Sequence, residues 1–94
     1  MRFTWNKVKN RQNIKSHGID FTDVPSMFDH PLLTRIDSRH EYGEERWIAI
    51  GILKTLFAVV VYVERIGDEI RIISARKATK DERQYYEKEI ADRL

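Results

Sequence analysis

The chain contains no cysteine, only two prolines and four glycines, and no apolar run long enough to span a membrane. Without cysteine it can form neither a disulfide framework nor a thiolate metal site, and this composition fits a reducing cytosol. No Gly-, Ser- or Pro-rich tract indicates a linker. Because a chain of 94 residues buries one hydrophobic core, we expect a single cytoplasmic domain over residues 1–94.

The sequence also lacks a strong charge of either sign. Lys and Arg number 17 and Asp and Glu number 15, which gives a formal net charge of +2. This balance generates no strong field for nucleic acid, so any basic site must be local. The three histidines are scattered without the Glu or Asp spacing of a zinc site. We therefore predict neither a metal nor a cofactor.

Capping residues predict two helices at the start of the chain. Asn6 is a good N-cap, Lys7–His17 contains neither Gly nor Pro, and Gly18 can end the helix in the left-handed conformation. A second, shorter helix is expected at residues 23–28 with Thr22 as its N-cap.

After these helices the pattern becomes extended. Four segments rich in β-branched and aromatic residues are separated by turn residues and predict antiparallel strands at 32–38, 46–52, 56–64 and 69–76. The third is apolar on both faces and therefore central. A capping box at Thr79 and Glu82 begins a last helix that runs to about residue 92, with an apolar stripe of Tyr86, Ile90 and Leu94. The predicted fold is α+β, with two N-terminal helices, a four-stranded antiparallel sheet without a parallel crossover, and a C-terminal helix.

The first helix carries a polar stripe. Lys9, Asn13 and His17 fall on one face at successive turns, and Asn6 lies close to that face. One interpretation is a solvated face. The other is a recognition face, in which lysine supplies charge for phosphate, asparagine supplies amide donors, and histidine moves protons near neutral pH. Both interpretations remain open on these residues alone.

Motifs in order along most of the chain resemble the BrnT family of bacterial toxins. The opening FTWNKVKNRQNIKSHGIDF is similar to the start of that family at Phe3, Trp5, Lys9, Asn13, His17, Gly18, Ile19 and Phe21. Gly43, Glu44 and Arg46 match its Gly-Glu-x-Arg, followed by Ile50-Gly51, and RIISARKATKDERQYY matches its Arg-Ile-Ile-Ser-Ala-Arg segment. Two positions depart from the pattern: Asn6 replaces an aspartate, and Ser16 replaces a lysine.

The resemblance implies a RelE-like fold, ribonuclease activity, and a BrnA-like, DNA-binding antitoxin partner in a hetero-oligomeric complex. Cleavage of RNA without a metal needs a base for the 2′-hydroxyl, an acid for the leaving oxygen, and cations for the phosphate. For catalysis we expect His17 as proton carrier, Glu44 as alternative base, Arg76 as phosphate clamp, and Tyr86 as proton donor or base-stacking residue. The RNA-binding or phosphate-binding residues expected are Lys9, Asn13, Arg46 and Lys77.

Each assignment has a structural alternative. Arg76 can pair with Glu82 or Asp81 across the turn. Tyr86 can be a packed core residue with a bonded hydroxyl. Ser74 is better interpreted as a small strand residue than as a nucleophile, because no catalytic serine motif surrounds it. For the whole protein, the alternative function is a non-enzymatic RNA- or protein-binding module that uses the same polar helix face.

Overall fold

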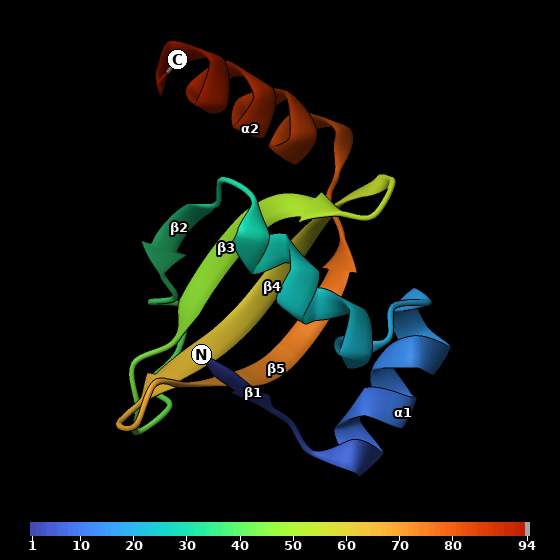
Figure 1. Ribbon diagram of the computed structural model, residues 1–94, viewed down its shortest axis with the longest axis vertical. Coiled ribbons are helices and arrows are strands. Elements are labelled where there is room, and N and C mark those ends of the chain that lie inside the picture. Colours follow the sequence, from blue (N-terminus) through green and yellow to red (C-terminus); the bar gives the residue numbers. More distant parts are fainter. Residues whose placement is uncertain (94) are drawn as a thin grey trace.

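Five strands form one mixed sheet in the order β1-β5-β4-β3-β2 (Figure 1). The computed structural model describes residues 1–93 of the chain. Neighbouring strands are antiparallel except at the β1–β5 edge, where they are parallel. In chain order the elements are β1 (Arg2–Thr4), α1 (Lys7–His17), η1 (Phe21–Asp29), β2 (Leu33–Ile36), β3 (Trp47–Leu53), β4 (Leu56–Arg65), β5 (Glu69–Lys77) and α2 (Lys80–Arg93).

The predicted four-stranded, fully antiparallel sheet is wrong at this edge. β1 adds a fifth strand in parallel with β5, and Phe3 lies opposite Ile70. The Thr4 hydroxyl donates to Glu69 at 2.6 Å, and the Arg2 guanidinium donates to the other oxygen of Glu69 at 3.2 Å. Three residues are too few for a period-two pattern to be recognised, so the sequence carried no signal for this strand.

The second predicted helix forms as a 3-10 helix rather than an α-helix, and it begins earlier than predicted. Its N-cap is Asp20, whose carboxylate accepts a hydrogen bond from the Thr22 backbone N–H at 2.9 Å. The side chain of Asn10 joins this start to α1, because its amide nitrogen donates to Asp20 and its oxygen accepts from the Phe21 N–H. Pro25 lies inside the segment and lacks the N–H for an α-helical bond.

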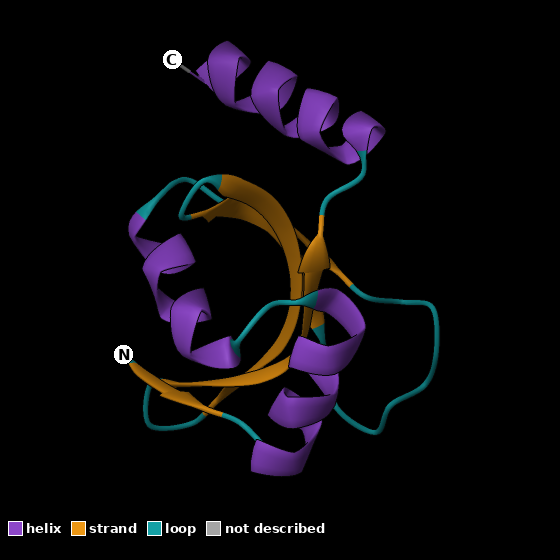
Figure 2. Cartoon of the chain, turned by 90° about the vertical axis from the view of Figure 1, so that its right-hand side faces the viewer, coloured by secondary structure: helices purple, strands orange, loops and turns teal. Residues whose placement is uncertain are grey.

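β4 is the central strand, and its apolar residues are buried on both faces, as predicted. On one face Ala58, Val60 and Tyr62 belong to the main core, where η1 lies in the hollow of the curved sheet (Figure 2). On the other face Val59 and Val61 form a smaller apolar cluster with Ile48. This smaller cluster supports the cavity described below.

The two α-helices follow their predicted capping. α1 begins after Asn6, whose side chain accepts from the Lys9 N–H at 3.0 Å, and it ends at Gly18, with φ at 70°. α2 lies beyond the end of the sheet and follows β5 (Figure 1). Tyr86 is the buried residue of its predicted apolar stripe, whereas Leu94 lies outside the described residues. None of the described helices is both long and apolar enough to cross a bilayer.

Candidate active site

A cavity of about 110 Å³ lies over the smaller apolar cluster of the sheet. Its floor is formed by the apolar side chains of Ile48, Val59 and Val61. The polar residues lining it come from α1, β2, the loop after β2, and β5: they are His17, Arg35, Arg39, Ser74 and Arg76. Guanidinium groups bind phosphate with paired hydrogen bonds, so three of them around one cavity form a suitable environment for a phosphate group.

His17 reaches this cavity because α1 is attached to β5 by Asn13, one helical turn before it. Asn13 is 7% exposed. Its amide nitrogen donates to the carbonyl oxygens of Ile19 and Ala75, each at 2.9 Å, and its amide oxygen accepts from the Ala75 N–H at 3.1 Å. Ala75 directly precedes Arg76 in β5. The Asn13 bridge therefore sets the position of His17 relative to Arg76.

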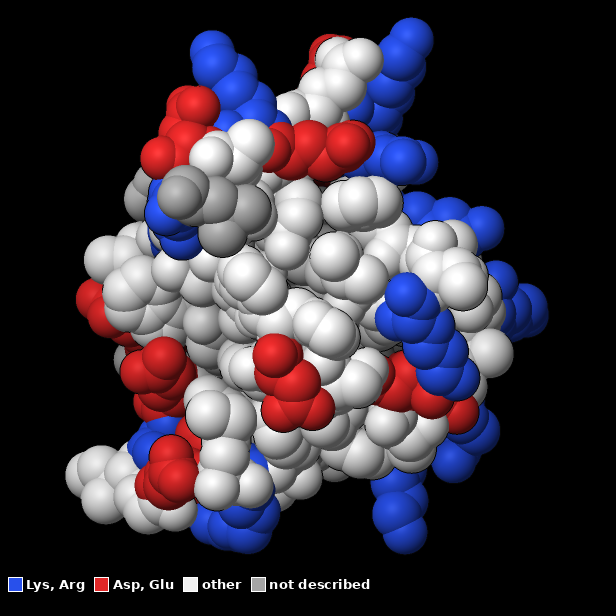
Figure 3. Space-filling view, turned by 45° about the horizontal axis from the view of Figure 1, so that its top comes forward, with Lys and Arg blue, Asp and Glu red and all other residues white. Residues whose placement is uncertain are grey.

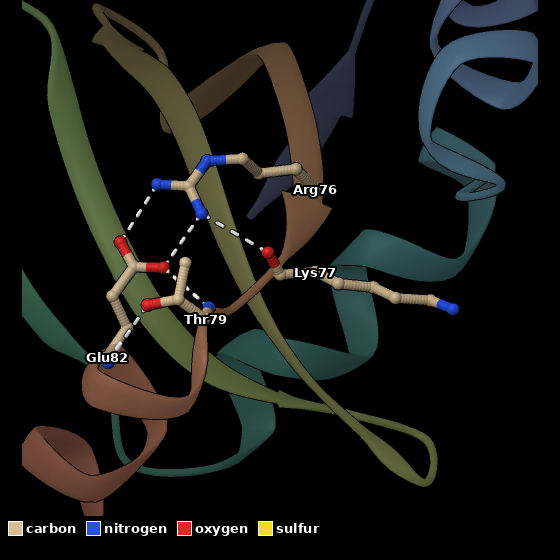
Figure 4. A network of polar contacts seen from close by, with 4 residues as sticks. All are labelled: Arg76, Lys77, Thr79 and Glu82. Carbon is tan, nitrogen blue, oxygen red and sulfur yellow. Dashed lines mark hydrogen bonds and ion pairs between the residues drawn. The ribbon is translucent and has the colours of Figure 1, made fainter.

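Arg76 is held by Glu82 of α2 in a paired, two-bond contact (Figure 4). Nη1 lies 2.8 Å from Oε1 and Nη2 lies 2.9 Å from Oε2, and Nη1 also donates to the Lys77 carbonyl at 3.2 Å. Hydrogen bonding from Arg76 lowers the pKa of Glu82 to about 2, and the same contact raises the pKa of Arg76. Glu82 also accepts from the Thr79 N–H at 2.8 Å, as the predicted capping box requires. Arg76 therefore pairs with Glu82 across the turn between β5 and α2, which is the structural alternative considered for it.

Lys9 and Lys77 lie on different sides of the site. Lys9 and His17 line a shallow hollow on α1, beside the cavity. Lys77 follows Arg76 in β5, and its side chain extends away from the Arg76 guanidinium (Figure 4). It lines a separate hollow with Phe57 and Arg83. Of the two predicted phosphate-binding lysines, the structure places only Lys9 next to His17.

Glu44 lies away from the cavity, in the long loop between β2 and β3. Its Oε1 is 3.5 Å from Nη2 of Arg65, at the end of β4. Arg65 is six positions along β4 from Val59, which lies opposite Arg76 in the sheet. At the usual rise per strand residue this is a backbone separation of about 20 Å. The structure therefore does not bring Glu44 together with His17 and Arg76.

Arg46 packs within the same loop. Its guanidinium carbon is 4.0 Å from the centre of the Tyr42 ring, a cation–π contact. Its Nε is buried and has no hydrogen-bond partner among the described residues. In this arrangement Arg46 stabilises the loop through Tyr42 and does not line the cavity.

Tyr86 is a packed core residue with a hydrogen-bonded hydroxyl, which is the structural alternative considered for it. It is 3% exposed, and its hydroxyl donates to the Pro31 carbonyl at 2.8 Å. Its ring packs edge-on against Phe57, with ring centres 5.6 Å apart. Burial raises the pKa of its hydroxyl. Tyr86 joins α2 to the rest of the protein at a place separate from the cavity.

A family model described as the ribonuclease toxin BrnT of type II toxin-antitoxin systems matches residues 5–82. The chain belongs to this family. The crystal structure of the Brucella abortus ribonuclease toxin BrnT resembles it with a TM-score of 0.67 at 24% sequence identity, over 85% of this chain and 99% of that chain, which shows the same fold. No curated protein matched the chain.

Membership of the BrnT family confirms the resemblance that the motifs predicted. A type II toxin family implies an antitoxin as partner. The family match ends at residue 82, so it includes the residues around the cavity and the first turn of α2. Most of α2 lies beyond the match, although Glu82 connects this helix to Arg76.

Sequence reasoning missed two of the residues around the cavity of this BrnT family member. Arg35 lies opposite Ile48 in the β2–β3 pairing, so it faces the same side of the sheet. Arg39 follows β2 and is bound by Asp37. An Asp-x-Arg spacing at the end of the strand predicted at 32–38 was the available signal for Arg39, but short spacings of this kind are common. Arg35 could be found only from the strand register.

Basic and acidic side chains are both spread over the face shown in Figure 3, and neither forms a continuous surface there. Within residues 1–93, no three His, Asp or Glu side chains gather closely enough to hold a metal ion.

Proposed function

We propose that this BrnT family member is a metal-independent endoribonuclease that cleaves RNA by attack of a ribose 2′-hydroxyl on the adjacent phosphate. The observation that supports the proposal is that His17 and Arg76, from elements far apart in the sequence, line one cavity. Histidine transfers protons near neutral pH, and arginine binds phosphate through two parallel hydrogen bonds. These are the two functions that the transesterification requires.

In the proposed reaction the O2′–P bond forms while the P–O5′ bond breaks. The proton of the 2′-hydroxyl leaves, the 5′ oxygen gains a proton, and the products are a 2′,3′-cyclic phosphate and a 5′-hydroxyl. His17 carries out proton transfer, and Arg76 stabilises the charge that develops on the phosphate oxygens. Lys9 adds positive charge from the neighbouring hollow.

A phosphate that binds the edge of the Arg76 guanidinium facing Glu82 must replace this carboxylate. In the structure, two of the five N–H groups of Arg76 face Glu82 and both oxygens of that carboxylate are engaged. The side chain of Arg76 is 42% exposed, so a phosphate can approach it from solvent. We therefore expect Glu82 to compete with RNA for Arg76.

The test is cleavage of single-stranded RNA by purified protein in excess EDTA, with detection of fragments that end in 2′,3′-cyclic phosphate. A matched RNA with 2′-O-methyl groups should stay intact. His17→Ala and Arg76→Ala should each slow cleavage by about 100-fold or more, without loss of folding. His30→Ala and Arg2→Ala remove the same residue types elsewhere and serve as controls. Glu44→Ala tests the alternative base.

Each outcome has a defined meaning. Near-normal cleavage by folded His17→Ala and Arg76→Ala would rule out this site. Cleavage that requires an added divalent cation would refute metal independence. RNA that binds but remains intact, with and without divalent cations, would favour the alternative function of a non-enzymatic RNA-binding module.

We further propose that the antitoxin is a BrnA-like, DNA-binding protein that holds this chain in a cytoplasmic hetero-oligomer. Membership of a type II toxin family supports this proposal, because a free ribonuclease would damage the RNA of its own cell. Co-expression with the product of the adjacent reading frame, followed by size-exclusion chromatography, should give a stable complex. Two proteins that elute separately would contradict this choice of partner.

A further inference from the structure

Arg39 is fixed by a carboxylate that is itself buried. The side chain of Asp37 is 0% exposed. One of its oxygens accepts from the Arg39 Nε at 2.8 Å and from the Arg39 backbone N–H at 3.2 Å. The other accepts from the Arg39 Nη2 at 2.9 Å and from the Tyr42 hydroxyl at 3.2 Å. These hydrogen bonds, those from Arg39 first, keep the pKa of Asp37 well below its usual range.

The guanidinium of Arg39 keeps donors for a second partner. Asp37 uses one N–H on Nε and one on Nη2, which leaves three of the five N–H groups. The side chain of Arg39 is 62% exposed. It lines the cavity of His17 and Arg76, and it also lines the hollow of about 620 Å³ formed by the loop of residues 37–45. The Arg39 guanidinium is therefore held by Asp37, is exposed, and keeps three N–H groups at a place that borders both the cavity and the loop hollow.

The charges around the cavity favour an anion. Arg39 is balanced by Asp37, and Arg76 is balanced by Glu82. Arg35 forms no ion pair within residues 1–93, so one guanidinium charge is unbalanced. The hydrogen bonds with Glu82 raise the pKa of Arg76, while burial and the charge of Arg39 act in the opposite direction. A phosphate among these groups would reduce the repulsion between Arg39 and Arg76.

We propose that Arg39 is a phosphate-binding residue of the RNA site, and that Asp37 is a positioning residue that holds the Arg39 guanidinium at the cavity. The inference rests on the proposed ribonuclease function and adds a second arginine to Arg76. Because Asp37 uses only one edge of the guanidinium, the other edge can bind an RNA phosphate while the ion pair stays intact. Arg76 has fewer donors to spare, because Glu82 and the Lys77 carbonyl together accept three hydrogen bonds from its guanidinium.

The test measures binding of a fluorescent, single-stranded 2′-O-methyl RNA to the full chain by anisotropy at several salt concentrations. Arg39→Gln should weaken binding by about tenfold or more. It should also reduce the slope of log affinity against log salt by about 0.7, because one phosphate contact is lost. Arg2→Gln is the matched control, since it removes the same charge at the β1 edge of the sheet. Its slope should equal that of the wild type.

Two further variants test the role of Asp37. Arg39→Lys keeps the charge but loses the paired geometry, so it should weaken binding without changing the salt slope. Asp37→Asn removes a negative charge, which by charge alone would strengthen binding to RNA. If Asp37 positions Arg39, the same variant should bind RNA more weakly. If Asp37→Asn does not fold, Arg39→Gln and Arg39→Lys, which change an exposed side chain, test whether a positioned Arg39 binds phosphate.

The results separate this inference from the proposed function. If the wild type binds and cleaves RNA while Arg39→Gln behaves like Arg2→Gln, the role of Arg39 is refuted and the ribonuclease proposal stands. If Arg39→Lys binds as the wild type does, the positioning role of Asp37 is refuted. A wild type that neither binds nor cleaves RNA would refute both proposals.

Discussion

Glu82→Gln should have opposite effects on stability and on RNA binding. Glutamine keeps the length of the side chain and can still accept the hydrogen bond from the Thr79 N–H, so the capping box survives. The ion pair with Arg76 is lost. The protein should therefore become less stable, while the Arg76 guanidinium becomes free for phosphate.

The size of the stability change follows from the pKa of Glu82. A fall from the ordinary value of 4.5 to about 2 sets an upper limit of about 3 kcal/mol on the contribution of its charged form. The side chains of Arg76 and Glu82 are 42% and 27% exposed, so solvent screening weakens their attraction. We expect a loss of about 1–2 kcal/mol at neutral pH. For a domain of this size, each 1 kcal/mol corresponds to about 4–8 °C in Tm.

The dependence on pH provides an independent check. Because the folded-state pKa of Glu82 is lower than its ordinary value, its contribution is complete above pH 4.5 and disappears as pH falls toward about 2. The difference in Tm between wild type and Glu82→Gln should be largest at neutral pH and should shrink below pH 4.5. A difference that stays constant down to pH 3, well below the ordinary value, would show that the ion pair is not its source.

The RNA-binding part uses anisotropy with 2′-O-methyl RNA. Freeing one guanidinium should strengthen binding by several-fold and increase the salt slope by about 0.7. Glu87→Gln is the matched control, because Glu87 forms an exposed ion pair with Arg83 on the same helix at 3.0 Å. That variant should change stability by about 0.5 kcal/mol at most. Unchanged or weaker RNA binding by Glu82→Gln would refute the idea that Glu82 and phosphate compete for Arg76.

Two further predictions separate supporting residues from the site. Tyr86→Phe removes the hydrogen bond to the Pro31 carbonyl and should lower the free energy of unfolding by about 1 kcal/mol. RNA cleavage per folded molecule should not change. Slower cleavage by the folded variant would restore Tyr86 as a catalytic candidate. Asn13→Ala leaves the Ala75 N–H and two carbonyl oxygens without their partner and should cost about 2–4 kcal/mol. In the fraction that folds, cleavage should also fall, because His17 loses its fixed position; thermal unfolding and cleavage of the same samples test both points.

Elements with strong local signals were predictable. The bounds of α1 match the prediction because Asn6 and Gly18 act through contacts within one turn of the helix. The last four strands were found because the segments that contain them are rich in β-branched and aromatic residues and are separated by turn residues. β1 was missed because its three residues form a strand only through pairing with Glu69–Lys77, far along the chain.

The candidate site was only partly predictable, because its residues meet through the fold. The family motifs indicated His17 and Arg76, and the structure places both at one cavity. The same motifs contain Glu44, which lies near the far end of β4 beside Arg65. A motif shows that residues recur together, but their separation depends on strand register and loop path. Arg39 shows the converse, because it belongs to no motif and lies at the cavity through its bond to Asp37.

Asn13 shows why a polar stripe on a helix cannot be interpreted from spacing alone. Helical geometry places Lys9, Asn13 and His17 on one face, which fits both a solvated surface and a recognition surface. In the structure the middle residue is buried against β5, while Lys9 and His17 on either side remain exposed. The partner that distinguishes these cases is the backbone of Ala75, 62 residues later in the chain. Because Asn13 donates both amide hydrogens to the backbone, it contributes to the site by placing His17 beside Arg76.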